Sequence, residues 1–210
     1  NGNEYLECML GAFKGRVTPF NVNYRYVAEE LTYLLNDSAA SIIVFHSTFA
    51  PVLESVLTEA LQLTLLLQVQ DESNNPLLPG AIWYEDALES SRDDEPSPSH
   101  PDDLYILYTG GTTGRPKGVL QTQRVWQSMT WIQMTEWEFP QEIRIAIATP
   151  LSHAAMTLLA PVLLSGGAFY VMDSFNPDDF YDLVAEQKIT CTLIVPSMLY
   201  ALQGHPRYET

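Results

Sequence analysis

Residues 104–122 read LYILYTGGTTGRPKGVLQT, and this stretch decides the expected fold of the 210-residue chain. Its first five residues form a short apolar run that is typical of a buried strand. A loop rich in glycine and threonine follows directly, and in open α/β sheets ligands bind at the carboxyl ends of strands. The stretch therefore predicts a strand of an α/β sheet that ends in a ligand-binding loop.

The loop within 108–119 has the composition of a polyphosphate site. Its glycines let the backbone approach a ligand closely and turn successive N–H groups toward an anion. Its threonines add hydroxyl donors, its lysine adds a positive charge, and Pro116 stiffens the approach to that lysine. The candidate phosphate-binding residues are Thr109, Gly110, Gly111, Thr112, Thr113, Gly114 and Lys117.

Two other interpretations of the loop are less favoured. The P-loop of nucleoside triphosphatases has Gly-Lys followed by Ser or Thr, with the lysine opening a helix. Here Pro116 precedes Lys117 and Gly118 follows it, so a P-loop enzyme is disfavoured. A plain hairpin needs only about two turn residues, far fewer than this stretch contains. The composition of the loop therefore favours ligand binding.

Apolar runs alternate with helical periodicities along the rest of the chain. The run SIIVF at 41–45 is typical of a strand covered on both faces. We expect the α/β class, with mostly parallel sheets flanked by helices. The expected strands are 41–45, 63–69 (where the pattern also allows a helix), 104–108, 144–149, 168–172 and 190–195. Helices are expected near Asn3, Val27, Pro51 (reaching Ala60), Gln123, Ala154, Pro177 (which follows Asn176) and Ser197 (as a cap).

A stretch at about 89–103 differs in texture from its surroundings. Its core, SSRDDEPSPSHPDD, is acidic and rich in serine and proline. Such a segment has too little apolar surface to order itself well, so we expect an exposed linker. The linker is either a domain boundary or a long surface excursion.

The charge of the chain excludes some classes of partner. Its 10 basic and 26 acidic residues give a net charge of -16, which argues against binding to nucleic acid or to anionic lipid. The lysines are few, namely Lys14, Lys117 and Lys188. One of these scarce cations lies in the glycine-rich loop close to Arg115, which favours an anionic ligand there.

The two cysteines and the hydropathy give the expected compartment. Cys8 and Cys191 stand apart in apolar stretches and form no Cys/His cluster for zinc. We interpret them as buried thiols in a reducing compartment. No apolar run approaches the roughly 18 residues of a membrane span, and the first residues do not form a signal peptide. We expect a cytoplasmic protein without a transmembrane segment.

The segment YTGGTTGRPKGV closely resembles the signature loop of the adenylate-forming superfamily, which includes acyl-CoA synthetases, luciferases and peptide-synthetase adenylation domains. Eleven of its twelve positions agree, and the exception is Gly110, where serine or threonine is common. Pro150–His153 is similar to the family's Pro-Leu-x-His turn, with Ser152 replacing an aromatic residue. The segment 11–45 is similar to the family's early region. The resemblance therefore spans nearly the whole chain and favours an acyl-CoA synthetase for fatty or aryl acids over an amino-acid adenylation domain.

The resemblance implies a reaction in two steps. A carboxylic acid and ATP form an acyl-adenylate and pyrophosphate, and coenzyme A then displaces AMP to give a thioester. It also implies that Thr109–Gly114 hold the β- and γ-phosphates and that Lys117 is the catalytic cation. Mg²⁺ would bridge the phosphates, with Thr109 as its protein ligand, and His153 would line the carboxylate pocket.

Several motifs of the family do not occur within 1–210. The sequence contains neither the aromatic-Gly-x-Thr-Glu motif nor the Thr-Gly-Asp segment with its ribose-binding aspartate. The small C-terminal domain with its catalytic lysine is also absent. We therefore expect residues 1–210 to be a fragment of the AMP-binding N-terminal domain that is inactive alone. A stand-alone, non-catalytic phosphate-binding module is the alternative.

Overall fold

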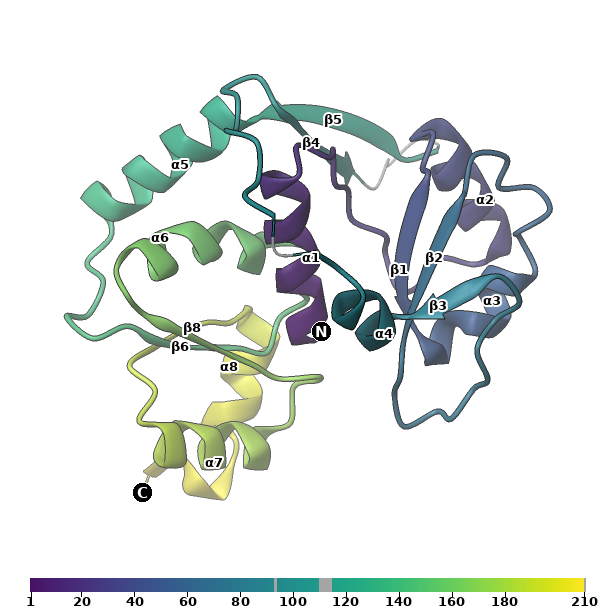
Figure 1. Cartoon of the computed structure of the whole chain (residues 1–210). Coiled ribbons are helices and arrows are strands. Elements are labelled where there is room, and N and C mark those ends of the chain that lie inside the picture. Colours follow the sequence, from purple (N-terminus) through teal and green to yellow (C-terminus); the bar gives the residue numbers. More distant parts are fainter. Residues whose placement is uncertain (93, 110–114, 210) are drawn as a thin grey trace. The chain divides into compact units, whose positions relative to one another are not determined.

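A computed structural model of the chain describes residues 1–92, 94–109 and 115–209 (Figure 1). The chain forms two compact units. One consists of Asn1–Leu10 and Thr122–Thr210, and the other of Gly11–Gln121. Helix α1 (Asn3–Lys14) begins in the first unit and ends in the second. The expected linker at about 89–103 therefore lies inside one unit rather than between the two.

The unit Gly11–Gln121 is built on a parallel sheet with the order β1-β2-β3. The buried leucines of α2, among them Leu31 and Leu35, pack with Phe45 of β1 and Leu66 of β2 in one core. The strand interpretation of 63–69 is thus confirmed. The elements are α2 (Ala28–Asp37), β1 (Ile42–His46), η1 (Ser47–Phe49), α3 (Ala50–Glu54), β2 (Leu65–Val69), β3 (Ala81–Trp83) and α4 (Tyr84–Glu89).

The helix expected over 51–60 is shorter than predicted. Helix α3 ends at Glu54, and hydrogen-bonded turns continue through 55–59. The Ser55 hydroxyl donates to the Val52 carbonyl oxygen at 2.7 Å, a local bond that competes with helix continuation. Val56 and Ala60 remain buried in the same core, so turns satisfy the apolar spacing that predicted a helix.

Strands β4 (Leu104–Thr109) and β5 (Lys117–Thr122) form a separate two-stranded sheet. The extended segment after α1 joins it, because Phe20 forms a parallel bridge with Ile106. Beside this bridge, the Asn21 side-chain amide donates to the Tyr105 hydroxyl at 2.6 Å, and both side chains are buried. Residues 94–102 lead into β4 and are exposed, with neither helix nor strand.

The buried Tyr105 hydroxyl should make the stability of this unit depend on alkaline pH. Burial raises the pKa of Tyr105 to about 12. The unfolded chain loses the same proton at a pH of about 10, so the folded state binds more protons between these values. The stabilisation is complete below about pH 10 and should then fall by about 1.4 kcal/mol per pH unit.

Replacing Tyr105 with phenylalanine should remove this part of the pH slope. The measurement is the free energy of unfolding in urea at several pH values between about 9 and 12. The exposed Tyr24, changed to phenylalanine, is the matched control. An alkaline slope that Tyr105→Phe leaves as steep as in the wild type would contradict the prediction.

The other unit is built on a parallel sheet with the order β7-β6-β8, which confirms the predicted parallel strands. Ile145 and Ile147 of β6 point into a core formed with η2 and α6, while Ala146 faces a second core with α7 and α8. Helices thus cover both faces of this sheet, as expected (Figure 1). The elements are α5 (Gln123–Glu136), β6 (Arg144–Ile147), η2 (Ala154–Leu158), α6 (Leu159–Leu164), β7 (Ala168–Val171), α7 (Pro177–Gln187), β8 (Cys191–Leu193), α8 (Pro196–Gln203) and η3 (Pro206–Glu209).

The predicted start of α7 is confirmed, and that of α8 is wrong by two residues. Asn176 caps α7, because its side-chain oxygen accepts from the backbone N–H groups of Asp178 and Asp179. The N-cap of α8 is Val195 rather than Ser197, since Pro196 occupies the first helical position. A proline there needs no hydrogen-bond partner, so the helix begins before the serine.

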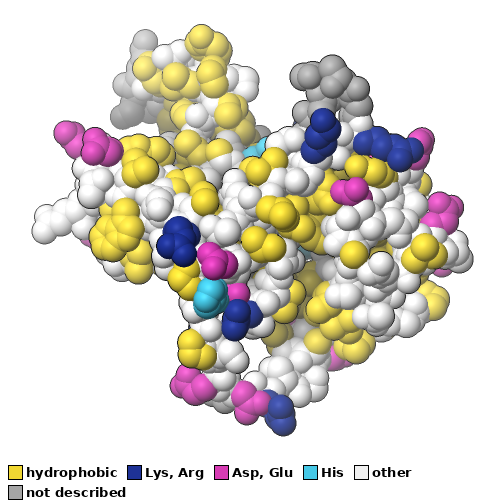
Figure 2. Space-filling view, turned by 90° about the horizontal axis from the view of Figure 1, so that it is seen from above, with side chains coloured by type: hydrophobic (Ala, Val, Ile, Leu, Met, Phe, Trp, Pro, Cys, Tyr) yellow, Lys and Arg dark blue, Asp and Glu magenta, His cyan; other side chains and the backbone are white. Residues whose placement is uncertain are grey.

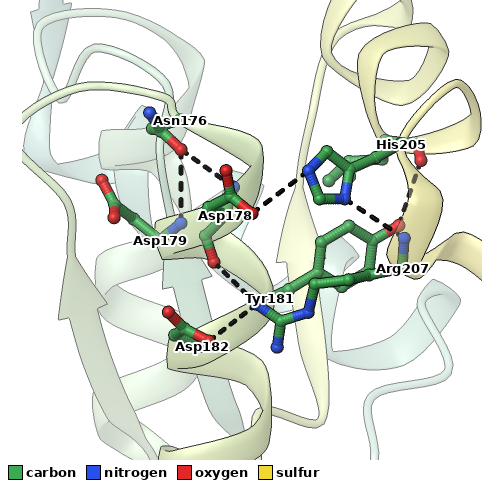
Figure 3. Close-up of polar contacts among 8 residues, drawn as sticks. Asn176, Asp178, Asp179, Tyr181, Asp182, His205 and Arg207 are labelled. Carbon is green, nitrogen blue, oxygen red and sulfur yellow. Dashed lines mark hydrogen bonds and ion pairs between the residues drawn. The ribbon is translucent and has the colours of Figure 1, made fainter. Parts of the chain in front are cut away.

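Polar contacts hold the last turn of the chain against α7 (Figure 3). Arg207 donates from Nη1 to Asp182 at 2.7 Å, and its guanidinium lies 5.3 Å from the ring centroid of Tyr181. Tyr181 in turn donates its hydroxyl proton to the Leu202 carbonyl oxygen at 3.0 Å. His205 Nε2 lies 3.2 Å from the Asp178 carboxylate. These contacts are spread over α7, α8 and η3 and fix their mutual packing.

The surface of the described residues agrees with the acidic composition. On the face that Figure 2 shows, Lys and Arg side chains stand apart among acidic and apolar ones, without a continuous basic surface. Within the described ranges, no helix is long and apolar enough to cross a membrane. Cys8 and Cys191 are free thiols and are half-buried rather than fully buried.

Candidate phosphate-binding site

The structure describes both ends of the predicted phosphate loop. Thr109 is the last residue of β4, and Lys117 is the first residue of β5. Gly110, Gly111, Thr112, Thr113 and Gly114 lie outside the described residues. The Thr109 hydroxyl donates to the Lys117 carbonyl oxygen at 3.4 Å, and both residues are exposed. The hydroxyl and the ammonium group therefore lie at the ends of paired strands, open to a ligand from solvent.

Gly118 has a packing role in addition to its place in the motif. A Cβ atom at this position would lie 2.9 Å from Ile106 Cγ2 and 3.2 Å from Tyr108 Cζ. Both neighbours belong to β4, so a glycine in β5 allows the two strands to come together. The sequence motif thus contains a residue whose size is limited by strand packing.

The residues on the carboxyl side of the loop contact α2. The Tyr33 hydroxyl donates to the Pro116 carbonyl oxygen at 3.1 Å. The Arg115 guanidinium lies 5.0 Å from the centroid of the Tyr33 ring, a cation–π distance. Burial and the Asp37 carboxylate raise the pKa of Tyr33, and Arg115 opposes them. Tyr33 is therefore a protonated donor at neutral pH.

The residue on the amino side of the loop contacts the same helix. The Tyr108 hydroxyl donates to Asp37 Oδ2 at 2.8 Å, and its ring meets the Phe20 ring edge-on at a centroid distance of 6.0 Å. Burial, and next the hydrogen bond to Asp37, raise the pKa of Tyr108 well above its ordinary value. Tyr108 therefore keeps its proton and acts as a hydrogen-bond donor to the carboxylate.

An open groove of about 620 Å³ lies along α2 beside these contacts. Its lining carries the carboxylates of Glu29, Asp37 and Glu59, and Arg115 is the one basic side chain among the described residues that line it. A groove with this excess of negative charge does not itself attract phosphate. The cation proposed for phosphate binding is Lys117, which does not line the groove.

His153 belongs to the other compact unit, and its surroundings are described separately. The turn that carries it is well fixed, because Leu151 is buried and its N–H group donates to the Asn1 side-chain oxygen at 3.0 Å. The His153 N–H group closes the turn on Pro150 O at 3.1 Å. Its ring is exposed, with Nδ1 2.9 Å from the Ser152 hydroxyl. Ser152 thus orients the imidazole in the place of the family's aromatic residue.

The described residues offer limited means of holding a metal ion. Across 1–92, 94–109 and 115–209, no group of three or more His, Cys, Asp or Glu residues is placed to bind one. The Thr109 hydroxyl oxygen is a hard donor of the kind that Mg²⁺ prefers, and its lone pairs are not used in donating to Lys117. Thr109 therefore fits an ion that arrives with phosphates and is held mainly by them.

Two of the residues around the loop were not found from the sequence. Asp37 and Tyr33 lie on α2, and Asp37 is 71 positions away from its partner Tyr108. The only local signal is a carboxylate in the last turn of a helix, where the helix dipole disfavours negative charge. A tertiary contact accounts for such a residue better than helix propensity does.

These observations place the chain in the α/β class, with an exposed threonine and lysine at the ends of a strand pair. The family described as AMP-binding enzyme matches residues 1–210, and the chain belongs to this family. The resemblance of the signature loop to adenylate-forming enzymes is thus confirmed. The predicted fold class is confirmed by solved structures, which share the fold of the chain.

Relatives include the medium-chain acyl-CoA ligase Mig of Mycobacterium avium, 57% identical over 124 residues, or 59% of this chain and 22% of that protein. The 3-oxocholest-4-en-26-oate–CoA ligase of Rhodococcus rhodochrous is 30% identical over 232 residues, covering 99% of this chain and 42% of that protein. The inhibitor-bound N-terminal domain of FACL13 from Mycobacterium tuberculosis has the same fold, with a TM-score of 0.84 at 24% identity over 100% of this chain and 51% of that one. The chain thus spans less than half of these two ligases.

Proposed function

We propose that this chain is part of an ATP-dependent acyl-CoA synthetase that acts on an apolar carboxylic acid. The observation that carries the proposal is the signature loop with its exposed Lys117, in a chain of the AMP-binding enzyme family. Two relatives are named as ligases of coenzyme A with a medium-chain acid and with a sterol-derived acid. Both acids join a carboxylate to an apolar body, so a fatty or aryl acid fits better than an amino acid.

The first half-reaction places negative charge beside the residues of the loop. A carboxylate oxygen attacks the α-phosphorus of ATP, the bond to the bridging oxygen breaks, and pyrophosphate leaves. Lys117 neutralises the charge that grows on the departing phosphates, and the Thr109 hydroxyl contributes a polar contact. Mg²⁺, held in part by Thr109, would supply further neutralisation when it is bound with ATP.

The second half-reaction passes the acyl group to coenzyme A. The thiolate attacks the acyl carbon, the bond to the phosphate oxygen breaks, and AMP leaves. His153, fixed on the turn of Pro150–His153, would line the pocket that holds the carboxylate end of the acid. Such a site accelerates the reaction mainly by holding both reactants in the reactive geometry.

The test uses a full-length protein that contains this chain. Acid-dependent exchange of pyrophosphate into ATP and formation of acyl-CoA thioester would be measured over a panel of medium-chain, long-chain, aryl and amino acids. We expect exchange and thioester formation with fatty or aryl acids. Exchange with amino acids alone, or the absence of exchange with every acid, would overturn the proposal.

The 210 residues alone should not catalyse the reaction. The two relatives are more than twice as long as their matches to this chain, and the motifs for ribose and adenylate binding do not occur in residues 1–210. The isolated chain should therefore show no acid-dependent exchange, although it carries the phosphate loop. Robust exchange by the isolated chain would contradict this expectation. If the full-length protein binds phosphate but shows no exchange, the alternative of a stand-alone, non-catalytic phosphate-binding module is favoured.

A further inference from the structure

One face of α2 holds both ends of the phosphate loop. Asp37 accepts a hydrogen bond from Tyr108, which precedes the loop, at 2.8 Å. Tyr33 donates a hydrogen bond to the carbonyl oxygen of Pro116, which follows it, at 3.1 Å. Tyr33 and Asp37 are four residues apart in a helix and so share one face. We call these two residues the loop anchors.

We propose that the loop anchors, Tyr33 and Asp37, are positioning residues for adenylate formation, an inference that rests on the proposed function. They touch the flanks of the loop rather than its phosphate-binding residues. Fixing Tyr108 and Pro116 holds the backbone on which the adjacent Thr109 and Lys117 are carried, so that their side chains are already in place when the phosphates bind. The anchors thus contribute to the rate through Thr109 and Lys117.

The loop anchors lie outside the buried face of α2. The buried face of α2 carries Leu31, Leu34 and Leu35, whereas Asp37 is exposed and Tyr33 is half-buried. A carboxylate in the last turn of a helix is also unfavourable to the helix itself, because it meets the negative end of the dipole. The position of Asp37 is therefore unfavourable for the helix, but it allows the hydrogen bond to Tyr108.

The second anchor is reinforced by a charge. The Arg115 guanidinium covers the Tyr33 ring at 5.0 Å, beside the carbonyl of Pro116 that the Tyr33 hydroxyl contacts. Arg115 and Pro116 come directly before Lys117, so the position of Tyr33 bears on the backbone that presents the lysine. The two anchors thus contact opposite ends of the loop.

The experiment measures adenylate formation by the full-length protein and its variants. Asp37→Ala, Tyr108→Phe and Tyr33→Phe should each lower the maximal exchange rate by about tenfold. The KM for the acid should stay within about twofold, and the melting temperature within about 4 °C, because no core residue changes. Glu29→Gln removes a carboxylate from the same helix and is the matched control, with an expected rate like that of the wild type.

A double mutant separates positioning from a general effect. Asp37→Ala combined with Tyr108→Phe should be no slower than either single variant, because both remove the same bond. Asp37→Ala combined with Tyr33→Phe should be slower than either. Three results would overturn the inference. The single variants could exchange at the wild-type rate, or their loss of rate could simply parallel a fall in melting temperature. The losses of rate from the Asp37 and Tyr108 substitutions could also be additive. If the wild-type protein itself shows no exchange with any acid, the proposed function fails first.

Discussion

Replacing Lys117 with alanine in a full-length protein that contains this chain should slow acyl-adenylate formation by about 10²-fold or more. Lys117 is the first residue of β5, is exposed, and stands beside the Thr109 hydroxyl at the other end of the loop. In a chain with a net charge of -16, few other cations are available to replace it near the phosphates. The measurement is acid-dependent exchange of pyrophosphate into ATP.

Two further variants define what the lysine contributes. Lys117→Arg keeps the charge but changes its shape, so it should restore part of the rate. Lys14→Ala removes an exposed lysine at the end of α1 and should leave exchange unchanged. Exchange at the normal rate in Lys117→Ala would remove this residue from the phosphate site, whatever acid the protein uses.

The sequence predicted the strands well where they coincide with apolar runs. Strands β2, β6, β7 and β8 fall within the expected runs, and β1 is shifted by one residue so that it includes His46. The run of β1 was expected to be covered on both faces, but Ile42 is exposed. Strand β3 was missed because three residues carry no periodicity, and α3 is shorter than expected because Ser55 bonds locally. Short elements depend on contacts that a sequence pattern does not contain.

The candidate site was likewise only partly predictable from the sequence. The loop residues Thr109 and Lys117 were found because glycine, threonine and lysine at this spacing have a chemical meaning of their own. Asp37 and Tyr33 have none, because they become part of the site only when α2 packs beside β4 and β5. The signature motif therefore predicts which residues contact a ligand, and the structure adds the residues that contact both ends of the loop.

Replacing Gly167 with alanine should destabilise its compact unit by about 3 kcal/mol, at the upper end of the usual cost of overpacking a core. A Cβ atom at this position would lie 2.8 Å from both Cβ and the carbonyl oxygen of Ile143 and 2.9 Å from Val162 Cγ1. Ile143 and Val162 are buried in one core. Because two of the three contacts involve atoms that cannot rotate away, the sheet or α6 must move.

The neighbouring Gly166 provides the matched control, because it is a glycine for a different reason. Both glycines end α6: Gly166 N–H donates to Leu163 O at 3.0 Å and Gly167 N–H to Val162 O at 2.9 Å, as in a Schellman motif. Gly166 has a φ of +69° and open space at its Cβ position, so alanine there should cost only about 1–2 kcal/mol.

Urea titration of the two variants compares these physical causes in one turn of the chain. Alanine reduces the entropy of the unfolded chain similarly at both positions, so that contribution cancels in the comparison. A greater loss for Gly167→Ala would mean that close packing of α6 against the residue before β6 limits this position. An equal or greater loss for Gly166→Ala would mean that the left-handed backbone dominates instead, and that the core around Ile143 accommodates a methyl group.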